Sequence, residues 1–351
     1  MSELLPRARL VDVLLGRAPL VGSRLDPSAP RGLVSPVEAR VRMGIPYGDL
    51  RADEAAQLAA GAGAKVALKA LVAALLEGGG EETPSVPLVS TELDALTIEE
   101  ALEALLAPAP PDRARLAYLV HPHALNLALL DGAHRRRLAE ADLRLPDGIG
   151  LRIGARLLGR KLRHNLCGTD LVPPLLERAR ARDVDVVLVG GAPGVAERCA
   201  AVWEEAHDAP IAWTSHGYLD ADGVEALRAR LRAGGGGLVL VGMGSPVQER
   251  FAAEQLADLG GWTVLTVGGL FDYFAGNVPR APLVWRELGL EWLFRLLQEP
   301  RRLALRYLVG NPAFLLATVA QRAGALRVPP ARRHLPAPPP RLEAGGHERA
   351  A

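Results

Sequence analysis

The chain has 351 residues, of which 49% are hydrophobic, so it holds enough apolar material for a large folded core. Its formal net charge of +1 lacks the positive field that is typical of nucleic-acid-binding proteins, so we expect no nucleic-acid partner. The spacing of its two cysteines, Cys167 and Cys199, predicts neither a disulfide framework nor a metal-binding pair. This cysteine usage is typical of a reducing compartment and predicts a cytoplasmic protein.

No apolar run in the sequence approaches the roughly 20 residues that a helix needs to cross a bilayer. The N-terminus also lacks a signal-peptide pattern, so we expect a protein that neither spans a membrane nor is exported. Because the net charge is close to zero, any attraction to a membrane or a phosphate has to come from a local group of charges.

Residues 1–90 are expected to form an N-terminal extension and a linker. Frequent Pro and Gly in the first fifty residues predict no compact domain, whereas the spacing of Ala and Leu over residues 52–77 predicts a helix. The Gly-rich segment 78–87 predicts the linker. Residues 13–24 and 35–45 faintly resemble the carboxyl-terminal part of bacterial polyprenyl-phosphate sugar-phosphate transferases, and a linker or docking arm is the alternative.

From about residue 96, short apolar segments alternate with helical patterns, which is typical of a parallel sheet covered by helices on both faces. We therefore predict an α/β, Rossmann-like core over residues 91–288. The strands are predicted over residues 117–120, 142–148 including a turn, 184–189, 211–214, 238–241 and 263–267. Helices are predicted between the strands, among them residues 124–130, 149–158 and 222–233.

Three of the predicted strands end in glycine turns, which are Gly190-Gly191, Gly242-x-Gly244 and Gly268-Gly269. The ends of parallel strands in an open α/β sheet lie along one edge, so we expect these turns to line a single crevice. A nucleotide or a phosphate is the natural ligand, because glycine lets the backbone approach closely. Gln248 and Glu249 follow the second turn and are expected to point towards that ligand. For each turn taken singly, a strand-to-helix connection that binds nothing is the alternative.

The second turn is not a dinucleotide fingerprint, because Val247 stands where the third glycine would be. The sequence has no P-loop either, so a nicotinamide-dependent enzyme is a less favoured alternative. It has no cluster of His and Cys at metal-ligand spacing, and no Asp-x-Asp pair of the type that holds a divalent ion beside a nucleotide diphosphate. We therefore predict chemistry that uses no metal and no cofactor.

A longer series of motifs runs from about residue 116 to residue 307, and its members in chain order are Pro146-Asp147-Gly148, Gly168-Thr169-Asp170, Gly190-Gly191-Ala192-Pro193, Gly217-Tyr218, Gly242-Met243-Gly244-Ser245-Pro246-Val247-Gln248-Glu249, Gly268-Gly269-Leu270-Phe271-Asp272, Arg280-Ala281-Pro282, Gly289-Leu290-Glu291-Trp292, Arg295-Leu296 and Glu299-Pro300. In order and spacing this series resembles the WecG/TagA/CpsF family of glycosyltransferases. The resemblance implies an inverting, metal-independent transfer of an N-acetylmannosamine-type or related hexose from a UDP-sugar. The implied acceptor is a polyprenyl-diphosphate-linked saccharide of bacterial surface polysaccharide biosynthesis.

In this resemblance Asp147 is implied to be the general base that deprotonates the acceptor hydroxyl. An aspartate beside a glycine at a strand end can open to a cleft, and a single-displacement transfer needs one base. The resemblance also implies that Tyr218, Gln248 and Asp272 surround the UDP group, through ring stacking, hydrogen bonds to the uracil edge and a bond to a ribose hydroxyl. The alternatives are a plain turn for Asp147, a core position for Tyr218 and a helix cap for Asp272.

The sequence departs from the family pattern at three positions. Leu119, His121 and Asn165 stand where the family usually has threonine, asparagine and arginine. These departures leave the donor sugar open and support the leading alternative, a nucleotide-sugar-binding protein whose catalysis is impaired. His121 and His123 are candidate replacement contacts to the donor, and Arg163 lies close in sequence to the missing arginine.

Residues 289–327 are predicted to form an amphipathic, arginine-rich helical appendage, which suits an anionic membrane surface or a diphosphate. The resemblance implies that this appendage binds the inner face of the cytoplasmic membrane peripherally and completes the active site. Arg295 and Arg302, seven residues apart, are expected to share a helical face and hold the leaving diphosphate, unless Pro300 interrupts the helix. An ordinary solvated helix is the alternative. Self-association is left open, and residues 328–351 predict a disordered tail.

Overall fold

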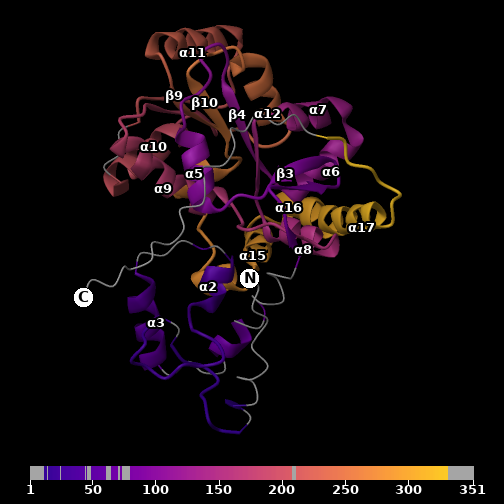
Figure 1. Ribbon diagram of the computed structural model, residues 1–351. Coiled ribbons are helices and arrows are strands. Elements are labelled where there is room, and N and C mark those ends of the chain that lie inside the picture. Colours follow the sequence, from indigo (N-terminus) through magenta and orange to yellow (C-terminus); the bar gives the residue numbers. More distant parts are fainter. Residues whose placement is uncertain are drawn as a thin grey trace, which may run out of the picture.

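In the computed structural model, a six-stranded parallel sheet forms the centre of the protein (Figure 1). The structure describes residues 12–13, 15–23, 25–43, 45, 49–60, 65–69, 72, 80–207 and 211–330. The sheet contains, in chain order, β4 (Arg115–Val120), β5 (Leu143–Pro146), β7 (Val186–Gly190), β8 (Trp213–Ser215), β9 (Gly237–Gly242) and β10 (Trp262–Thr266). Their order across the sheet is β5-β4-β10-β9-β7-β8, and every neighbouring pair is parallel. The predicted α/β, Rossmann-like fold is confirmed.

Alternate residues of each strand enter two separate hydrophobic cores, because successive side chains point to opposite faces of a sheet. Tyr118 and Val239 belong to one core, and their neighbours Leu119 and Leu240 belong to the other. The first core is covered by α6 (Pro122–Leu130), α7 (Gly132–Glu140), α8 (Ile149–Leu157), α11 (Ala221–Gly234) and the π-helical turn η1 (Ala252–Leu256). The second is covered by α5 (Ile98–Leu106), α9 (Gly168–Ala181), α10 (Val195–His207) and α13 (Leu270–Phe274). Burial on both faces explains why the strand sequences are continuous apolar runs.

Two short pairs of strands precede and flank the main sheet. The antiparallel pair β2 (Ser85–Leu88) and β3 (Thr91–Asp94) places Val86 and Leu88 fully inside the first core. The strands β1 (Glu81–Glu82) and β6 (Arg160–Lys161) pair in parallel. The linker expected over residues 78–87 is therefore wrong for its described part, residues 80–87.

The N-terminal extension contains α2 (Glu38–Met43) and α3 (Leu50–Ala59), which lie away from the sheet, with α2 next to α15 (Glu291–Gln298) and α3 further from it (Figure 1). Its described part is gathered around the buried carboxylate of Glu54, which accepts hydrogen bonds from the hydroxyls of Ser23 and Ser35 and the backbone N–H of Leu25. A buried carboxylate needs such donors, and they draw distant parts of the extension together. The expectation that this broken sequence builds no compact unit is thus wrong for the described part. The predicted tail lies outside the described residues from residue 331 onwards.

The appendage consists of α15 (Glu291–Gln298), α16 (Pro300–Ala304), the π-helical turn η2 (Leu305–Val309) and α17 (Gly310–Arg322). Phe314 of α17 is buried in the first core against Gly154 of α8. The side chain of Gln321 also bonds to the backbone N–H of Val89 at 2.7 Å and to the carbonyl of Pro87 at 2.9 Å. The appendage therefore packs against the core and hydrogen-bonds to it along α17.

One continuous helical run, Pro300–Arg322, is long and apolar enough to cross a membrane by length and composition. The expectation that the sequence contains no such segment is therefore wrong. Only a small part of its most apolar stretch is buried in the protein, and Phe314 and Thr318 are the buried residues of α17. The large apolar side chains exposed on this run are Leu305, Leu308, Val309, Leu316 and Val319.

Candidate active site

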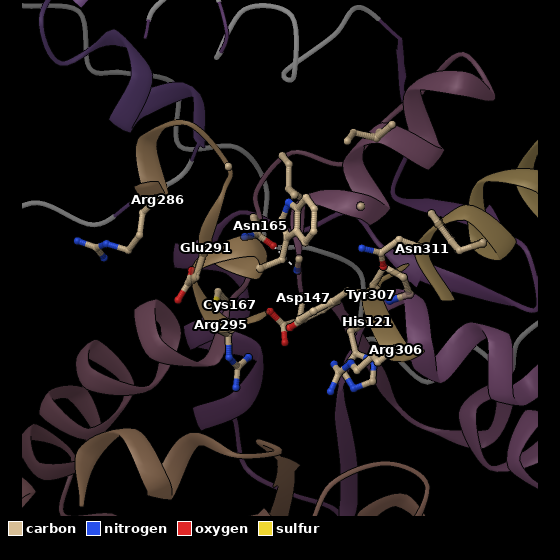
Figure 2. Close-up of a pocket in the computed structure, with 18 of the residues that line it drawn as sticks. His121, Asp147, Asn165, Cys167, Arg286, Glu291, Arg295, Arg306, Tyr307 and Asn311 are labelled. Atoms are coloured by element: carbon tan, nitrogen blue, oxygen red, sulfur yellow. Dashed lines mark hydrogen bonds between the residues drawn. The ribbon is translucent and has the colours of Figure 1, made fainter. Parts of the chain in front are cut away.

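A cavity of about 450 Å³ lies where the carboxyl ends of β4 and β5 meet the appendage (Figure 2). Its polar lining residues are His121, Asp147, Asn165, Cys167, Thr169, Asp170, Tyr273, Arg286, Glu291, Arg295, Arg306, Tyr307 and Asn311. Its apolar lining residues are Ile45, Pro122, Ile149, Ile153, Trp292, Leu308, Pro312, Phe314 and Leu315. The cavity thus has charged groups of both signs beside an extended apolar wall.

Asp147 follows the last residue of β5, and its carboxylate points into the cavity (Figure 2). The Asp147 N–H donates to the carbonyl of Val120 at 2.7 Å, and the next N–H, of Gly148, donates to Asn165 Oδ1 at 2.6 Å. Gly148 has a φ of 105°, which a residue with a side chain rarely adopts, so this turn depends on glycine. Burial raises the pKa of Asp147, and the positive charges of Arg295 and Arg306 only partly oppose the rise. A carboxylate with a raised pKa is a stronger base than an ordinary aspartate.

His121 caps the N-terminus of α6 and lines the cavity beside Arg306 (Figure 2). Its Nδ1 accepts the N–H of Ala124 at 3.0 Å, so this nitrogen carries no proton. Burial, followed by the nearby charge of Arg306, lowers the pKa of His121 well below its ordinary value. The imidazole is therefore neutral with its proton on Nε2, where it can donate one hydrogen bond. His123 does not line the cavity, although its ring stacks on that of His121 with centroids 6.0 Å apart.

The appendage contributes two arginines to the cavity lining, Arg295 and Arg306. Arg295 lies over the ring of Tyr273, with its guanidinium carbon 4.8 Å from the ring centroid. Arg302 does not line the cavity and is largely exposed, with Nη1 donating to Glu299 Oε1 at 2.8 Å. Arg295 and Arg302 nevertheless converge, because a side chain at Gly269 would meet the Nη2 atoms of both at 3.9 Å.

The single helical face expected for Arg295 and Arg302 is not present, because the chain leaves the helical conformation at Glu299, with φ −124° and ψ 58°. Pro300 then begins α16. Arg306 reaches the cavity from the π-helical turn η2, where the helical period departs from that of an α-helix. The appendage therefore presents Arg306, rather than Arg302, to the space around Asp147.

Arg286 and Glu291 lie on the opposite side of the cavity from His121 (Figure 2). Asp170 accepts hydrogen bonds from Arg280 and from Arg286, the latter at 3.3 Å. Glu291 also faces the cavity, and its pKa is raised by burial and by the neighbouring charge of Asp170. Among the described residues, no three His, Cys, Asp or Glu side chains are grouped in a way that suits a metal ion.

The glycine turns at the ends of β7, β9 and β10 adjoin one another, as the sequence predicts, but none of their glycines lines the cavity. A side chain at Gly190 would collide with the carbonyl of Gly242, and one at Gly242 would lie 2.9 Å from the carbonyl oxygen of Gly268. Gly217, after β8, would meet the Cα of Gly190 at 3.2 Å. The four strand ends thus form one continuous row, which reaches the appendage arginines at Gly269. Gly191 and Gly244 belong to the same row, and both have positive φ values.

Gln248 and Glu249 are buried beneath this row and do not line the cavity. Gln248 Oε1 accepts the N–H of Gly244 at 3.2 Å and that of Gly268 at 2.9 Å. Its Nε2 donates to Glu249 Oε1 at 3.0 Å, and that carboxylate also accepts the hydroxyl of Ser245. Gln248 thus joins two glycine turns, whereas Glu249 Oε2 is buried without a hydrogen-bond partner among the described residues.

The other predicted site residues lie outside the cavity. Tyr218 follows Gly217 at the end of the row and is 77% exposed, so its ring is free to stack on a ligand. Asp272 lies in the first turn of α13, where Oδ1 accepts from Asn277 Nδ2 at 3.0 Å. Arg163 is bound to Glu100 and to the carbonyl of Ala95, so it does not take the place of an arginine at Asn165.

Sequence reasoning missed several cavity residues, among them Cys167, Arg286 and Arg306. The thiol of Cys167 is in hydrogen-bond contact with the Thr169 hydroxyl at 3.3 Å, and burial raises the pKa of the thiol well above its ordinary value, so it stays protonated. The only sequence signal for Cys167 is its place directly before the Gly168-Thr169-Asp170 motif. Arg306 lies in the arginine-rich appendage, but its position relative to Arg295 depends on the irregular helix.

A parallel α/β sheet with a row of glycine turns, next to a cavity with a basic carboxylate and several guanidinium groups, suits an enzyme that transfers a group from a nucleotide-linked donor. The model of the glycosyl transferase WecG/TagA/CpsF family matches residues 86–327, which is more than half of the chain. The chain belongs to this family and is a glycosyltransferase of cell-surface polysaccharide synthesis. Its substrates are accordingly a nucleotide-sugar donor and a lipid-linked acceptor.

Proposed function

We propose that this glycosyltransferase moves an N-acetylmannosamine-type or related hexose from a UDP-sugar to a polyprenyl-diphosphate-linked saccharide, with inversion and without a metal. The observation that carries the proposal is the position of Asp147, a carboxylate with a raised pKa that lines the same cavity as Arg295 and Arg306. A base and cations on one cavity match the two needs of this reaction, deprotonation of the acceptor and stabilisation of the leaving diphosphate.

In the proposed step, Asp147 takes the proton from the acceptor hydroxyl. The resulting oxygen nucleophile forms a bond to the anomeric carbon from the face opposite the UDP group, while the bond from that carbon to the phosphate oxygen breaks. The configuration is inverted because there is one displacement. Negative charge develops on the departing diphosphate, where Arg295 and the arginines near it can stabilise that charge through paired hydrogen bonds.

The row of glycine turns is the proposed binding groove for the donor. The row contains Gly190, Gly191, Gly242 and Gly244. At Gly244 the backbone can approach the nucleotide closely, because a side chain there would point into open space. The exposed ring of Tyr218 at one end of the row suits stacking on uracil, and Asp272 suits a ribose hydroxyl. At the other end, the Nε2–H of His121 is a donor for the sugar or its phosphate, as an asparagine amide would be.

Peripheral association with the inner face of the cytoplasmic membrane is part of the proposal. The apolar side chains exposed on η2 and α17 support it, and they are Leu305, Leu308, Val309, Leu316 and Val319. Arginines such as Arg301 lie on the neighbouring helix, which suits an anionic lipid surface. Such a location brings the cavity to a lipid-linked acceptor.

A donor panel tests the function. Purified protein is supplied with individual UDP-hexoses and a polyprenyl-diphosphate-linked saccharide, and release of UDP is measured together with the glycosylated lipid. We expect one donor to give both products. UDP binding without transfer from any donor would instead identify a nucleotide-sugar-binding protein, an alternative favoured by the lack of an arginine in the place of Asn165.

The pH profile should report the raised pKa of Asp147. A base acts when ionised, so turnover should fall as the pH is lowered through that pKa, at a higher pH than an ordinary aspartate value of 3.8 would give. Turnover at saturating substrates measures this acidic limb of the pH profile, which is the fall in turnover at low pH. Circular dichroism checks that the protein stays folded. Glu291→Gln is the control, because removing the second titrating carboxylate should leave the limb in place. A limb centred at or below 3.8 contradicts the assignment.

Gln248→Leu should weaken donor binding, because the N–H groups of Gly244 and Gly268 lose their shared acceptor. An unsatisfied buried amide costs roughly 1–3 kcal/mol, so we expect the affinity for UDP to fall by about tenfold. Calorimetric titration with UDP measures the change. Gln255→Leu on η1, away from the turns, should leave the affinity unaltered. Unchanged UDP affinity in Gln248→Leu would mean that the turns hold their shape without this bridge.

A further inference from the structure

The N-terminal extension is joined to the glycosyltransferase core through a fully buried carboxylate, Glu287 of α14 (Leu283–Glu287). Glu287 Oε1 lies 3.0 Å from Arg40 Nε, and Oε2 lies 2.6 Å from Lys69 Nζ. Both cations belong to the extension, which precedes the part of the chain that matches the family. A carboxylate removed from water needs opposite charges close by, so α14 as observed depends on the extension.

The same contact includes an apolar part that reaches the cavity. Ala39 and Ile45 are buried and pack against Ile149 of α8 and Leu283 of α14. Ile45 and Ile149 also line the cavity, where they continue the apolar wall formed by Ile153 and residues of η2 and α17. The extension therefore provides part of the surface that a substrate meets.

Helix α14 connects this contact to the charged side of the cavity. Arg286, the residue before Glu287, lines the cavity and donates to Asp170 at 3.3 Å. Gly289 and Glu291, which also line the cavity, follow within four residues of Glu287. A displacement of α14 would move Arg286 and the beginning of the appendage together.

We propose that the extension is a working part of the acceptor side of the active site. Arg40 and Lys69 act as positioning residues that hold α14 through Glu287. Ile45 completes the apolar wall and contacts the isoprenoid part of the acceptor next to its diphosphate. The pairing of an apolar wall with cavity arginines matches the chemistry of a polyprenyl diphosphate. This inference rests on the proposed function, because it assigns an acceptor contact to that same site.

The first test compares two acceptors that share one saccharide diphosphate, one carrying a polyprenyl chain and one carrying a methyl group. Ile45→Asp should raise the KM for the polyprenyl acceptor by about tenfold, because a charge replaces an apolar contact, and should leave the KM for the methyl acceptor within about twofold. Ile45→Ala should change the same KM in the same direction by a smaller factor. Val41→Ala, an exposed position on α2, is the matched control and should change neither value.

The second test removes the charge of the joining carboxylate. Glu287→Gln should lower kcat/KM for the polyprenyl acceptor by about tenfold or more, while calorimetry shows UDP affinity within about twofold of the unchanged protein. Asp53→Asn is the matched control, because Asp53 also pairs with Arg40 but is 42% exposed. A purely structural role would instead lower the melting temperature and affect UDP affinity and acceptor use equally.

The outcomes separate this inference from the proposed function. If the unchanged protein transfers sugar but Ile45→Asp and Ile45→Ala use both acceptors normally, the inference is overturned. If the unchanged protein transfers no sugar, the proposed function fails, and binding of the polyprenyl acceptor in detergent micelles decides the inference. Equal affinity of the unchanged protein and Ile45→Asp for that acceptor would overturn it, and an affinity about tenfold lower in Ile45→Asp would support it.

Discussion

Asp147→Asn should lower turnover by roughly 10²–10⁴-fold at saturating donor and acceptor, because the amide cannot accept the proton of the acceptor hydroxyl. Asn keeps the size of the side chain, and its backbone contacts to Val120 are unaffected, so the cavity should keep its shape. Formation of the glycosylated lipid measures the loss, and calorimetry should show that UDP still binds. Turnover within about tenfold of the unchanged protein would remove Asp147 from the role of base.

The same substitution should raise the melting temperature at pH 7–8. The folded-state pKa of Asp147 is raised by burial, so ionisation of the carboxylate above that pKa costs the folded state free energy that the unfolded state does not lose. Asn removes this cost, and the difference from the unchanged protein should shrink as the pH is lowered through the raised pKa. Asp185→Asn, an exposed change at the opposite end of the sheet, should alter neither turnover nor melting temperature.

Arg295→Ala should lower turnover by about 10²-fold or more, because the leaving diphosphate loses a desolvated cation. Arg306→Ala should act in the same direction, since Arg306 lines the same cavity. Arg302→Ala should have a smaller effect, because Arg302 is exposed and reaches only the rim at Gly269. Turnover at saturating donor measures each variant, and thermal melting shows whether loss of the Arg295 contact to Tyr273 also weakens the fold.

Two further variants test whether the Arg295 guanidinium stabilises the leaving diphosphate or only contacts the membrane. Arg295→Lys keeps the charge but loses the planar pair of donors. Its turnover should therefore be higher than that of Arg295→Ala and lower than that of the unchanged protein. Arg230→Ala, an exposed arginine on α11 that does not line the cavity, is the matched control and should keep normal turnover. If Arg295→Ala turns over normally and only loses binding to anionic vesicles, the arginine is a membrane contact and takes no part in charge stabilisation.

The strands could be predicted because a strand buried on both faces is a continuous apolar run with a turn at its end. The predicted segments 184–189 and 238–241 agree with β7 and β9 to within two residues. The β2–β3 pair could not be predicted in the same way. Its strands have four residues each, one contains Pro87, and they pack against β5, α7 and α8, which follow later in the sequence.

The position of a candidate site residue was predictable where it depends on local chain geometry. Asp147 at the end of β5 and the glycine turns are of this kind, since parallel strands bring their carboxyl ends to one edge. Gln248 shows the limit of such reasoning. Its position after Gly244 predicted a side chain that points towards the ligand. The packed structure shows instead that its Oε1 accepts the N–H groups of Gly244 and Gly268.

The sequence by itself determined the parallel α/β sheet, the row of glycine turns and the position of Asp147, because these follow from periodicity and turn chemistry within short segments. Only the tertiary structure decided which arginines reach Asp147. The break at Glu299 and the π-helical turn η2 change the rotation along the appendage, so Arg306 enters the cavity and Arg302 stays outside. The contact of Glu287 with Arg40 and Lys69 was also decided by the tertiary structure, because these residues are more than 200 positions apart in the sequence. They meet because the folded chain buries the Glu287 carboxylate, and a buried carboxylate is stable only beside opposite charges.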